Sequence, residues 1–300
     1  MSDENPLIES QVQMDFNRAR LWANLKATIA RLSGLPSQLL SFEEVREKLH
    51  IGGPIYRGVQ QVPVEKILGS VDRYRDFDRA FLPLSHRFGE RWRSVNRAFY
   101  QDVSLPPVLL YQVDQVYFVV DGHHRVSVAR EHGQLYIDAE VRECQVSVPV
   151  SADIKPEDLV VLGQQAEFYR RTDIQRLRPD HNIEVTVLGG YDRMLEHIAV
   201  HRYFLGLDWA REISSEEAVT HWFDEVYTQI VATLSQNDIL SAFPGRTFGD
   251  LYLWVLDHQH FLVEQTESQL SPPQQAAEAF VELVQKEVVA PRKKPKPKSE

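Results

Sequence analysis

Hydrophobic residues near the N-terminus recur at spacings of three and four, a pattern typical of helices that pack on one face. It predicts a helix over about residues 8–33, which Ser33-Gly34-Leu35-Pro36 ends. Ser41, with Glu44 three residues later, predicts the capped start of a short second helix. We therefore expect residues 1–54 to form a helical extension packed on the domain that follows.

Short apolar runs typical of strands replace this pattern between residues 55 and 145. The runs are Val62–Leu68, Pro106–Leu110, Tyr117–Val120 and Leu135–Val141. The third run stops at Asp121-Gly122, and apolar residues at helical spacing follow directly. This pattern predicts a strand that leads straight into a helix, with His123, His124 and Arg125 in the first helical turn.

The start of such a helix suits phosphate, because its unpaired N–H groups and the positive end of the helix dipole both attract anions. Gly122 lets the backbone turn tightly and approach a ligand closely. The guanidinium of Arg125 can grip two oxygens of one anion. The competing interpretation is a solvated polar turn. Two histidines and an arginine crowd a turn where one capping residue suffices, which favours a binding site.

The order Asp121-Gly122-His123-His124-Arg125 resembles the signature loop of the ParB/sulfiredoxin superfamily, and the flanking strands follow in the superfamily's order. Related loops hold a nucleotide in ParB-type CTPases and in a ParB-like free-serine kinase, and in sulfiredoxin the loop cradles ATP phosphates. The resemblance implies a mixed α/β nucleotide-binding domain over residues 55–145. Sulfiredoxin's reactive cysteine falls at His123, so its thiolate chemistry is not available at this position.

An arginine-rich segment precedes the loop. Between Gly69 and Ala98, seven arginines stand among four acids, and this local positive patch favours an anionic ligand. The alternative is a helix in which the acids pair with the arginines. In the superfamily the stretch after the first strand lies near the nucleotide, so the resemblance adds Arg73 and Arg75 to the expected binding residues.

The remainder of the chain is mostly helical in pattern. We expect a linker subdomain over residues 146–190, with strands at Val146–Val150 and Ile183–Leu188 and a helix from Lys155 to about Tyr169. A helical domain over residues 191–288 resembles, across about 190–265, a bacterial domain of unknown function that accompanies ParB-like domains. Its predicted core includes Trp222, Val226, Trp254 and Phe280, and its predicted helix caps are Ser214, Thr247 and Ser271-Pro272.

The C-terminal half has two further features, a pair of histidines and a basic tail. His197 and His201, four residues apart on one predicted helix, have a spacing that suits zinc, but no third ligand stands at a motif spacing. The tail over residues 289–300 is rich in lysine and proline, and we expect it to be disordered.

Composition narrows the class of protein. With 43% hydrophobic and 25% charged residues, the chain has the composition of an ordinary globular protein. The single cysteine, Cys144, excludes an internal disulfide framework and is expected to be buried. An acidic N-terminus and the lack of a long apolar run predict a cytoplasmic protein without membrane contact. The net charge of −10 argues against a body that coats DNA.

The predicted fold class is α+β: a ParB/sulfiredoxin-like mixed α/β domain between a helical extension and a C-terminal helical domain. We expect a nucleotide (ATP, ADP and CTP are not distinguished) with its phosphates at Gly122–Arg125. Asp121 would hold Mg²⁺, and His123 or His124 would act as the acid–base group. The activity would be hydrolysis or phosphoryl transfer.

Other functions and partners stay open at this point. The alternative to an enzyme is a non-catalytic, nucleotide-gated binding or regulatory module that contacts DNA or a protein partner. A homodimer is compatible with either interpretation. A ParB-like nuclease is disfavoured, because the sequence lacks a dedicated carboxylate cluster for two metal ions.

Overall fold

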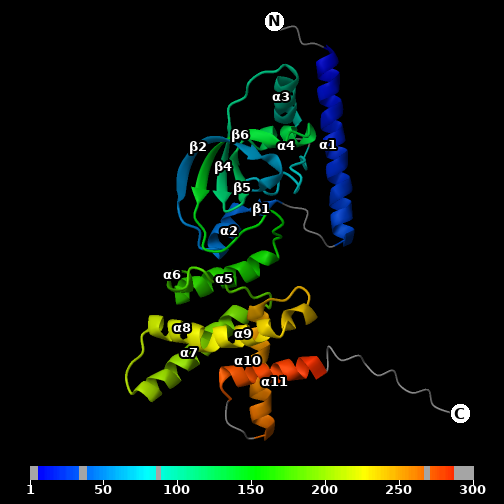
Figure 1. Ribbon diagram of the computed structural model, residues 1–300. Coiled ribbons are helices and arrows are strands. Elements are labelled where there is room, and N and C mark those ends of the chain that lie inside the picture. The colour runs from blue at the N-terminus through cyan, green and yellow to red at the C-terminus, as the bar shows by residue number, and fades with distance from the viewer. Residues whose placement is uncertain (1–5, 34–38, 86–88, 267–270, 287–300) are drawn as a thin grey trace, which may run out of the picture. The chain divides into compact units, whose positions relative to one another are not determined.

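The computed structural model describes residues 6–33, 39–85, 89–266 and 271–286 (Figure 1). The chain divides into two compact units, Met1–Gly163 and Gln164–Glu300, with the division inside helix α5 (Asp158–Thr172). The domain boundaries expected from the sequence stay predictions. The expected tail over residues 289–300 lies outside the described residues. None of the helices in the described part of the chain has the length and apolar character that a bilayer crossing demands.

The first unit is built on a mixed sheet of six strands. Its elements are α1 (Pro6–Ser33), β1 (Leu40–Ser41), α2 (Phe42–Lys48), β2 (Pro54–Pro63), β3 (Ile67–Ser70), α3 (Gly89–Tyr100), β4 (Val108–Val113), β5 (Val116–Asp121), α4 (His123–Glu131) and β6 (Tyr136–Cys144). The strand order is β1-β3-β5-β4-β6-β2. Strands β3 and β5 are parallel neighbours, so their carboxyl ends lie at the same edge of the sheet. The expected mixed α/β architecture is confirmed at this level.

One predicted strand is divided in the structure. The apolar run Val62–Leu68 contains the end of β2, a 3₁₀ turn over Val64–Lys66 and the start of β3. Strand β2 pairs with β6 at one edge of the sheet, whereas β3 pairs with β5 several strands away. The chain must therefore leave the sheet between them, and the apolar pattern does not reveal that change of partner.

The core of the first unit lies between the sheet and α4. Val62, Ile67, Leu110, Val119, Val126, Ala139 and Val141 are among its buried members, with Phe77 and Phe81 from the loop after β3. Helix α2 covers the other face through Phe42, whose ring lies 4.9 Å from Tyr111 and 5.5 Å from Phe118 between ring centres. As predicted, Ser41 caps α2 by accepting a bond from the amide of Glu44, and Cys144 is buried.

Helix α1 lies along α3 and α4 (Figure 1). Its buried Asp15 accepts hydrogen bonds from Asn96 (3.1 Å) and Tyr100 (2.8 Å), both on α3. Arg18, also on α1, donates to Glu131 at the end of α4 (2.7 Å). These contacts fix the predicted N-terminal helix on the sheet domain, because a buried carboxylate is stable only with such donors around it.

Arg130 anchors the C-terminal end of α4. Its guanidinium donates to the carbonyls of Ile67 (2.6 Å), Val64 (3.1 Å) and Arg79 (3.1 Å), and it lies 5.0 Å from the centre of the Phe81 ring. Burial lowers the pKa of Arg130 to about 10, so the side chain stays charged at neutral pH. This half-buried cation ties α4 to the segment between β2 and β3.

The second unit is helical. Its elements are α6 (Ile174–Leu177), α7 (Gly190–Trp209), α8 (Ser215–Trp222), a π-helical turn (Phe223–Tyr227), α9 (Thr228–Gln236), a 3₁₀ turn (Ile239–Ala242), α10 (Phe248–Thr266) and α11 (Pro273–Val284). Ser214 and Glu217 form the predicted capping box of α8. Thr247 accepts a bond from the amide of Asp250 at the start of α10. Helix α11 follows Pro272, which makes no side-chain cap, so the predicted cap at Ser271-Pro272 is wrong in that detail.

Both strands predicted between residues 146 and 190 are wrong. Val146–Val150 is irregular, with the amide of Val150 bonded to the carboxylate of Asp114 (2.8 Å). Ile183–Leu188 is irregular as well. The amides of Val185, Thr186 and Val187 bond to side chains of the later helices α7 and α10. Asp250 accepts from Thr186 through both its amide and its hydroxyl (2.8 and 2.6 Å). Backbone groups satisfied in this way need no neighbouring strand.

The predicted core of the second unit is partly confirmed. Trp222 and Phe280 are buried, whereas Val226 and Trp254 are only half-buried. Tyr227 is buried instead of Val226, because the π turn adds a residue to the helical repeat and rotates the next side chain inward.

Candidate functional site

The loop between β5 and α4 has the predicted strand–turn–helix geometry. Strand β5 ends at Asp121, Gly122 is the N-cap with a φ of 101°, and α4 begins at His123. A Cβ at Gly122 would lie 2.6 Å from Cγ1 of Val108, so both the backbone conformation and the space require glycine. The first bond of the helix runs from the amide of Val126 to the carbonyl of Gly122. The amides before Val126 therefore point out of the helix start, where an anion is favoured.

His123 is buried and turned toward the end of β3. Its Nε2 lies 2.7 Å from Oγ of Ser70, and its ring stacks on Phe77 at 5.9 Å between centres. Burial is the main cause that lowers the pKa of His123 to about 3, followed by the charges of Arg73 and His124, against an opposing effect of Asp121. The imidazole is therefore neutral at pH 7 and acts as a hydrogen-bond partner rather than as a cation.

His124 lies beside it in a similar environment. Its ring meets Phe77 edge to face at 5.4 Å between centres. The pKa of His124 is lowered to about 4, mainly by burial and then by the charges of Arg73 and Arg91. Two cations thus act on the start of α4 from the loop after β3 and from α3. The positive potential of these two arginines at the start of α4 favours the binding of an anion there.

Ser70 is a site residue that the sequence reasoning missed. It is buried at the carboxyl end of β3, and its hydroxyl accepts a bond from the amide of Arg73 (2.9 Å) in addition to its contact with His123. Ser70 could have been predicted only from the sheet topology. Two parallel neighbouring strands bring the residues at their carboxyl ends to one edge, where ligands bind in α/β sheets. Ser70 is paired with Val119 in that register, two residues before Asp121.

The two predicted arginines differ in position. Arg73 is half-buried, and its charge acts on both histidines. Arg75 is exposed, with its guanidinium 5.3 Å from the centre of the Tyr74 ring. The structure therefore brings Arg73 to the start of α4, and it adds Arg91, which the sequence reasoning placed only in the general positive patch.

Arg125 and Asp121 form an ion pair at the mouth of the loop. Nη2 of Arg125 donates to Oδ2 of Asp121 at 2.6 Å, and Nη1 donates to the carbonyls of Pro106 and Pro107. The Arg125 side chain is 15% exposed, whereas that of Asp121 is 67% exposed. In this state Arg125 fixes the loop before β4 to the start of α4. Its predicted grip on a phosphate and the predicted Mg²⁺ at Asp121 stay predictions.

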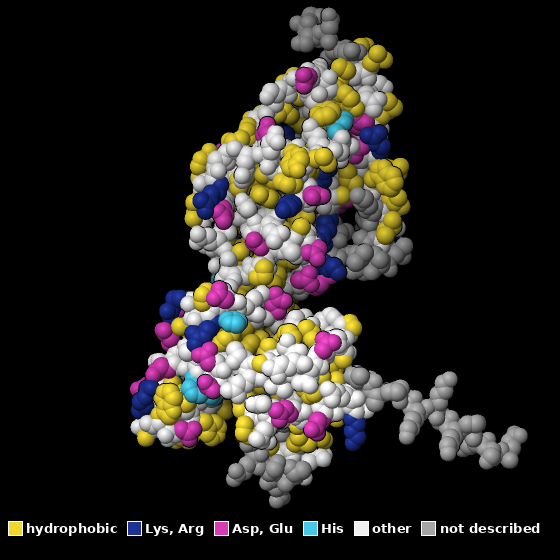
Figure 2. Space-filling model, viewed as in Figure 1, with side chains coloured by type: hydrophobic (Ala, Val, Ile, Leu, Met, Phe, Trp, Pro, Cys, Tyr) yellow, Lys and Arg dark blue, Asp and Glu magenta, His cyan; other side chains and the backbone are white. Residues whose placement is uncertain are grey.

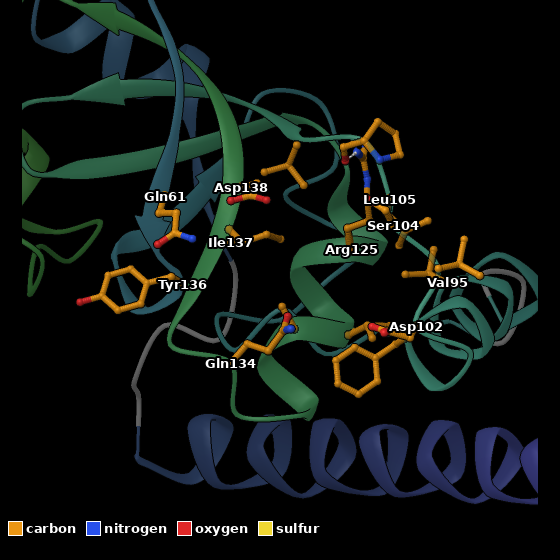
Figure 3. Close-up of a pocket in the computed structure, with 16 residues that line it drawn as sticks. Gln61, Val95, Asp102, Ser104, Leu105, Arg125, Gln134, Tyr136, Ile137 and Asp138 are labelled. Carbon is orange, nitrogen blue, oxygen red and sulfur yellow. Dashed lines mark hydrogen bonds between the residues drawn. The ribbon is translucent and has the colours of Figure 1, made fainter.

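The opposite side of α4 borders a cavity of about 540 Å³ (Figure 3). Arg125 lies at one end of it, next to Ser104 and Leu105. Asp138 from β6 and Asp102 from the loop after α3 also line it. The cavity lining includes Arg125 but neither histidine nor Ser70, so the cavity is separate from the buried cluster of Ser70, His123 and His124.

The histidines of the second unit are distributed over separate contacts. Nδ1 of His197 lies 3.2 Å from the hydroxyl of Tyr252, and Nε2 of His201 lies 2.9 Å from Nδ1 of His221. The predicted pair His197 and His201 therefore faces two different partners. Within the residues that the structure describes, no three His, Cys, Asp or Glu side chains gather at a position that could hold a metal ion.

No protein-family model and no curated protein matches this chain.

Proposed function

We propose that the first unit binds a nucleotide through its phosphates at the start of α4. The observation that carries the proposal is the arrangement around Gly122. A helix start opened by a left-handed glycine adjoins two buried, neutral histidines in the positive field of Arg73 and Arg91. Oriented amides with nearby guanidinium groups are the combination that phosphate favours.

The resemblance of the Asp121–Arg125 loop to the ParB/sulfiredoxin superfamily supports a nucleotide over simple phosphate. In that group the corresponding loop holds ATP or CTP. The position of the loop at the carboxyl edge of β3 and β5 agrees with the general rule for ligands of α/β sheets. The calorimetry described below identifies the base of the nucleotide.

For the activity we propose Mg²⁺-dependent hydrolysis or phosphoryl transfer. The exposed carboxylate of Asp121 suits Mg²⁺, which commonly takes one protein carboxylate together with phosphate and water oxygens and would neutralise charge on the phosphates. The ion pair with Arg125 is compatible with this assignment, since an arriving phosphate offers Arg125 an alternative anion. His123, neutral at pH 7, would orient the Ser70 hydroxyl through their hydrogen bond, since its lowered pKa makes it a weak base.

A specific observation favours the alternative, a non-catalytic nucleotide-gated module. The Asp121 carboxylate already has a partner in Arg125, which compensates its charge as a metal ion would. In that case nucleotide binding would change the loop between Arg125 and Pro107 and alter contacts with a DNA or protein partner.

The first test is calorimetry with ATP, ADP, CTP and GTP in the presence of Mg²⁺. We expect at least one nucleotide to bind, and Arg73→Ala to weaken it by about 1.5–3 kcal/mol, the scale of a charge-assisted hydrogen bond. Arg75→Ala, two residues away and exposed, is the matched control and should change binding by less than about 0.5 kcal/mol. A wild-type chain that binds none of the four nucleotides would end the proposal.

Turnover is tested separately with Asp121→Asn. If the chain is an enzyme, this variant should lower Mg²⁺-dependent phosphate release far more than it lowers nucleotide affinity. If the wild type binds a nucleotide and releases no product, the binding module is the correct function.

A further inference from the structure

Helix α7 in the second unit carries an exposed apolar stripe. Val200, Tyr203, Phe204 and Leu207 are 55%, 64%, 53% and 59% exposed. Figure 2 shows hydrophobic side chains gathered in the lower left part of the view, where Figure 1 draws α7. Positions three and four apart lie on one face of a helix, so these four form a continuous surface. Four large side chains gathered in this way are more than the scattered apolar residues of an ordinary surface.

The spacing of the stripe is symmetric. Val200 lies three residues before Tyr203, and Leu207 lies three residues after Phe204. A twofold axis through the midpoint between Tyr203 and Phe204 therefore places Val200 of one copy opposite Leu207 of the other, with the helices antiparallel. The aromatic rings then meet at the centre. Such self-complementarity is the requirement for a twofold interface made of one surface patch used twice.

Charge follows the same symmetry. Glu196 lies seven residues before Tyr203, and Arg211 lies seven residues after Phe204. Glu196 is exposed and has no ion pair or side-chain hydrogen bond among the described residues. Arg211 lies just beyond the end of α7, with its guanidinium 4.9 Å from the centre of the Trp209 ring. Arg211 also pairs with Glu217 of its own chain (2.7 Å). Across the axis each Glu196 would therefore share the other copy's guanidinium with that carboxylate, which an arginine with five N–H donors permits.

The available area fits a reversible dimer. Aromatic side chains bury about 150–250 Å² each when fully covered, so the exposed parts of the four residues offer on the order of 500 Å² per copy. The total of about 1,000 Å² is at the lower limit for a specific interface. We propose that α7 is the dimerisation helix of this protein, and that its occupant is α7 of a second copy in antiparallel orientation.

The first experiment measures the monomer–dimer equilibrium of the full chain by sedimentation over a wide concentration range. Phe204→Glu should raise the dimer dissociation constant at least tenfold, because it puts two carboxylates at the symmetry axis. Phe261→Glu is the matched control: Phe261 is 52% exposed on α10 of the same unit, and its substitution should leave the constant unchanged. A wild type that stays monomeric, or a dimer that Phe204→Glu does not weaken, would overturn the proposal.

The second experiment tests the orientation. Oxidised mixtures of Val200→Cys and Leu207→Cys copies should form the mixed disulfide, because the two positions face each other. Copies with Val200→Cys alone should not cross-link, since the two equivalent positions lie about 10 Å apart along the helix axis and a disulfide needs Cα atoms within about 7 Å. The native Cys144 is buried and stays out of the reaction. Cross-linking of Val200→Cys with itself as readily as with Leu207→Cys would exclude the antiparallel arrangement.

Discussion

Gly122 is the most constrained residue of the candidate site, and its replacement by alanine tests the geometry directly. Its φ of 101° lies in the left-handed region, which costs an L-residue about 1–2 kcal/mol. The added Cβ would lie 2.6 Å from Cγ1 of Val108 and 2.9 Å from Nη2 of Arg125. The arginine can move, but Val108 is buried in the core and cannot, which adds about 1–3 kcal/mol of overpacking. We expect Gly122→Ala to destabilise the first unit by about 2–5 kcal/mol.

Gly133 supplies the matched control for this substitution. It follows the other end of α4 with a φ of 66°, and a Cβ there would have no atom within 4 Å. Gly133→Ala therefore carries only the backbone cost, about 1–2 kcal/mol. Hydrogen exchange of the α4 amides, followed by mass spectrometry, measures the opening free energy of this helix in each variant. If Gly122→Ala cost no more than Gly133→Ala, the contact between Gly122 and Val108 would not be as close as the structure has it.

Three further substitutions test other parts of the molecule. Asp250→Ala should destabilise the second unit by about 3 kcal/mol or more, because Thr186 loses the acceptor of both its amide and its hydroxyl; urea unfolding measures the loss. His123 has a lowered pKa in the folded state, so the unfolded chain binds more protons between about pH 3 and 6.5, and stability falls as the pH drops through that window. His123→Asn should make that fall shallower by about one proton, and unchanged pH dependence would contradict the burial of the ring. Asp15→Ala should speed hydrogen exchange along α1 by at least tenfold while exchange in β4 stays unchanged, since Asn96 then loses its partner on that helix.

The local signals of the sequence were sufficient for the start of α4. Asp121 ends the strand, Gly122 takes the left-handed conformation, and His123 opens the helix, because all three depend on neighbours in the chain. The capping residues Ser41 and Ser214 were predictable for the same reason. Each of these features is decided within a few residues.

Features decided by distant partners were not predictable in this way. The segment Ile183–Leu188 alternates like a strand, but its amides bond to Asp250, more than sixty residues later, and to the hydroxyl of Tyr191. The contact between Ser70 and His123 depends on the parallel pairing of β3 with β5, which periodicity does not encode. The π turn before Thr228 moved Tyr227 into the core because it changed the helical repeat within one turn.

Two arginines hold α4 at its opposite ends, and this has a kinetic consequence. Arg125 fixes the first turn to the carbonyls of Pro106 and Pro107, and Arg130 fixes the last turn to those of Val64 and Ile67. A ligand arriving at Gly122 therefore meets amides that are already in place, so little ordering has to accompany its capture. In a stopped-flow mixing experiment, the observed rate of the association phase should rise in proportion to ligand concentration and reach no plateau, because the helix start is formed before the encounter. The exchange of Arg125 from Asp121 to the ligand would follow as a separate phase.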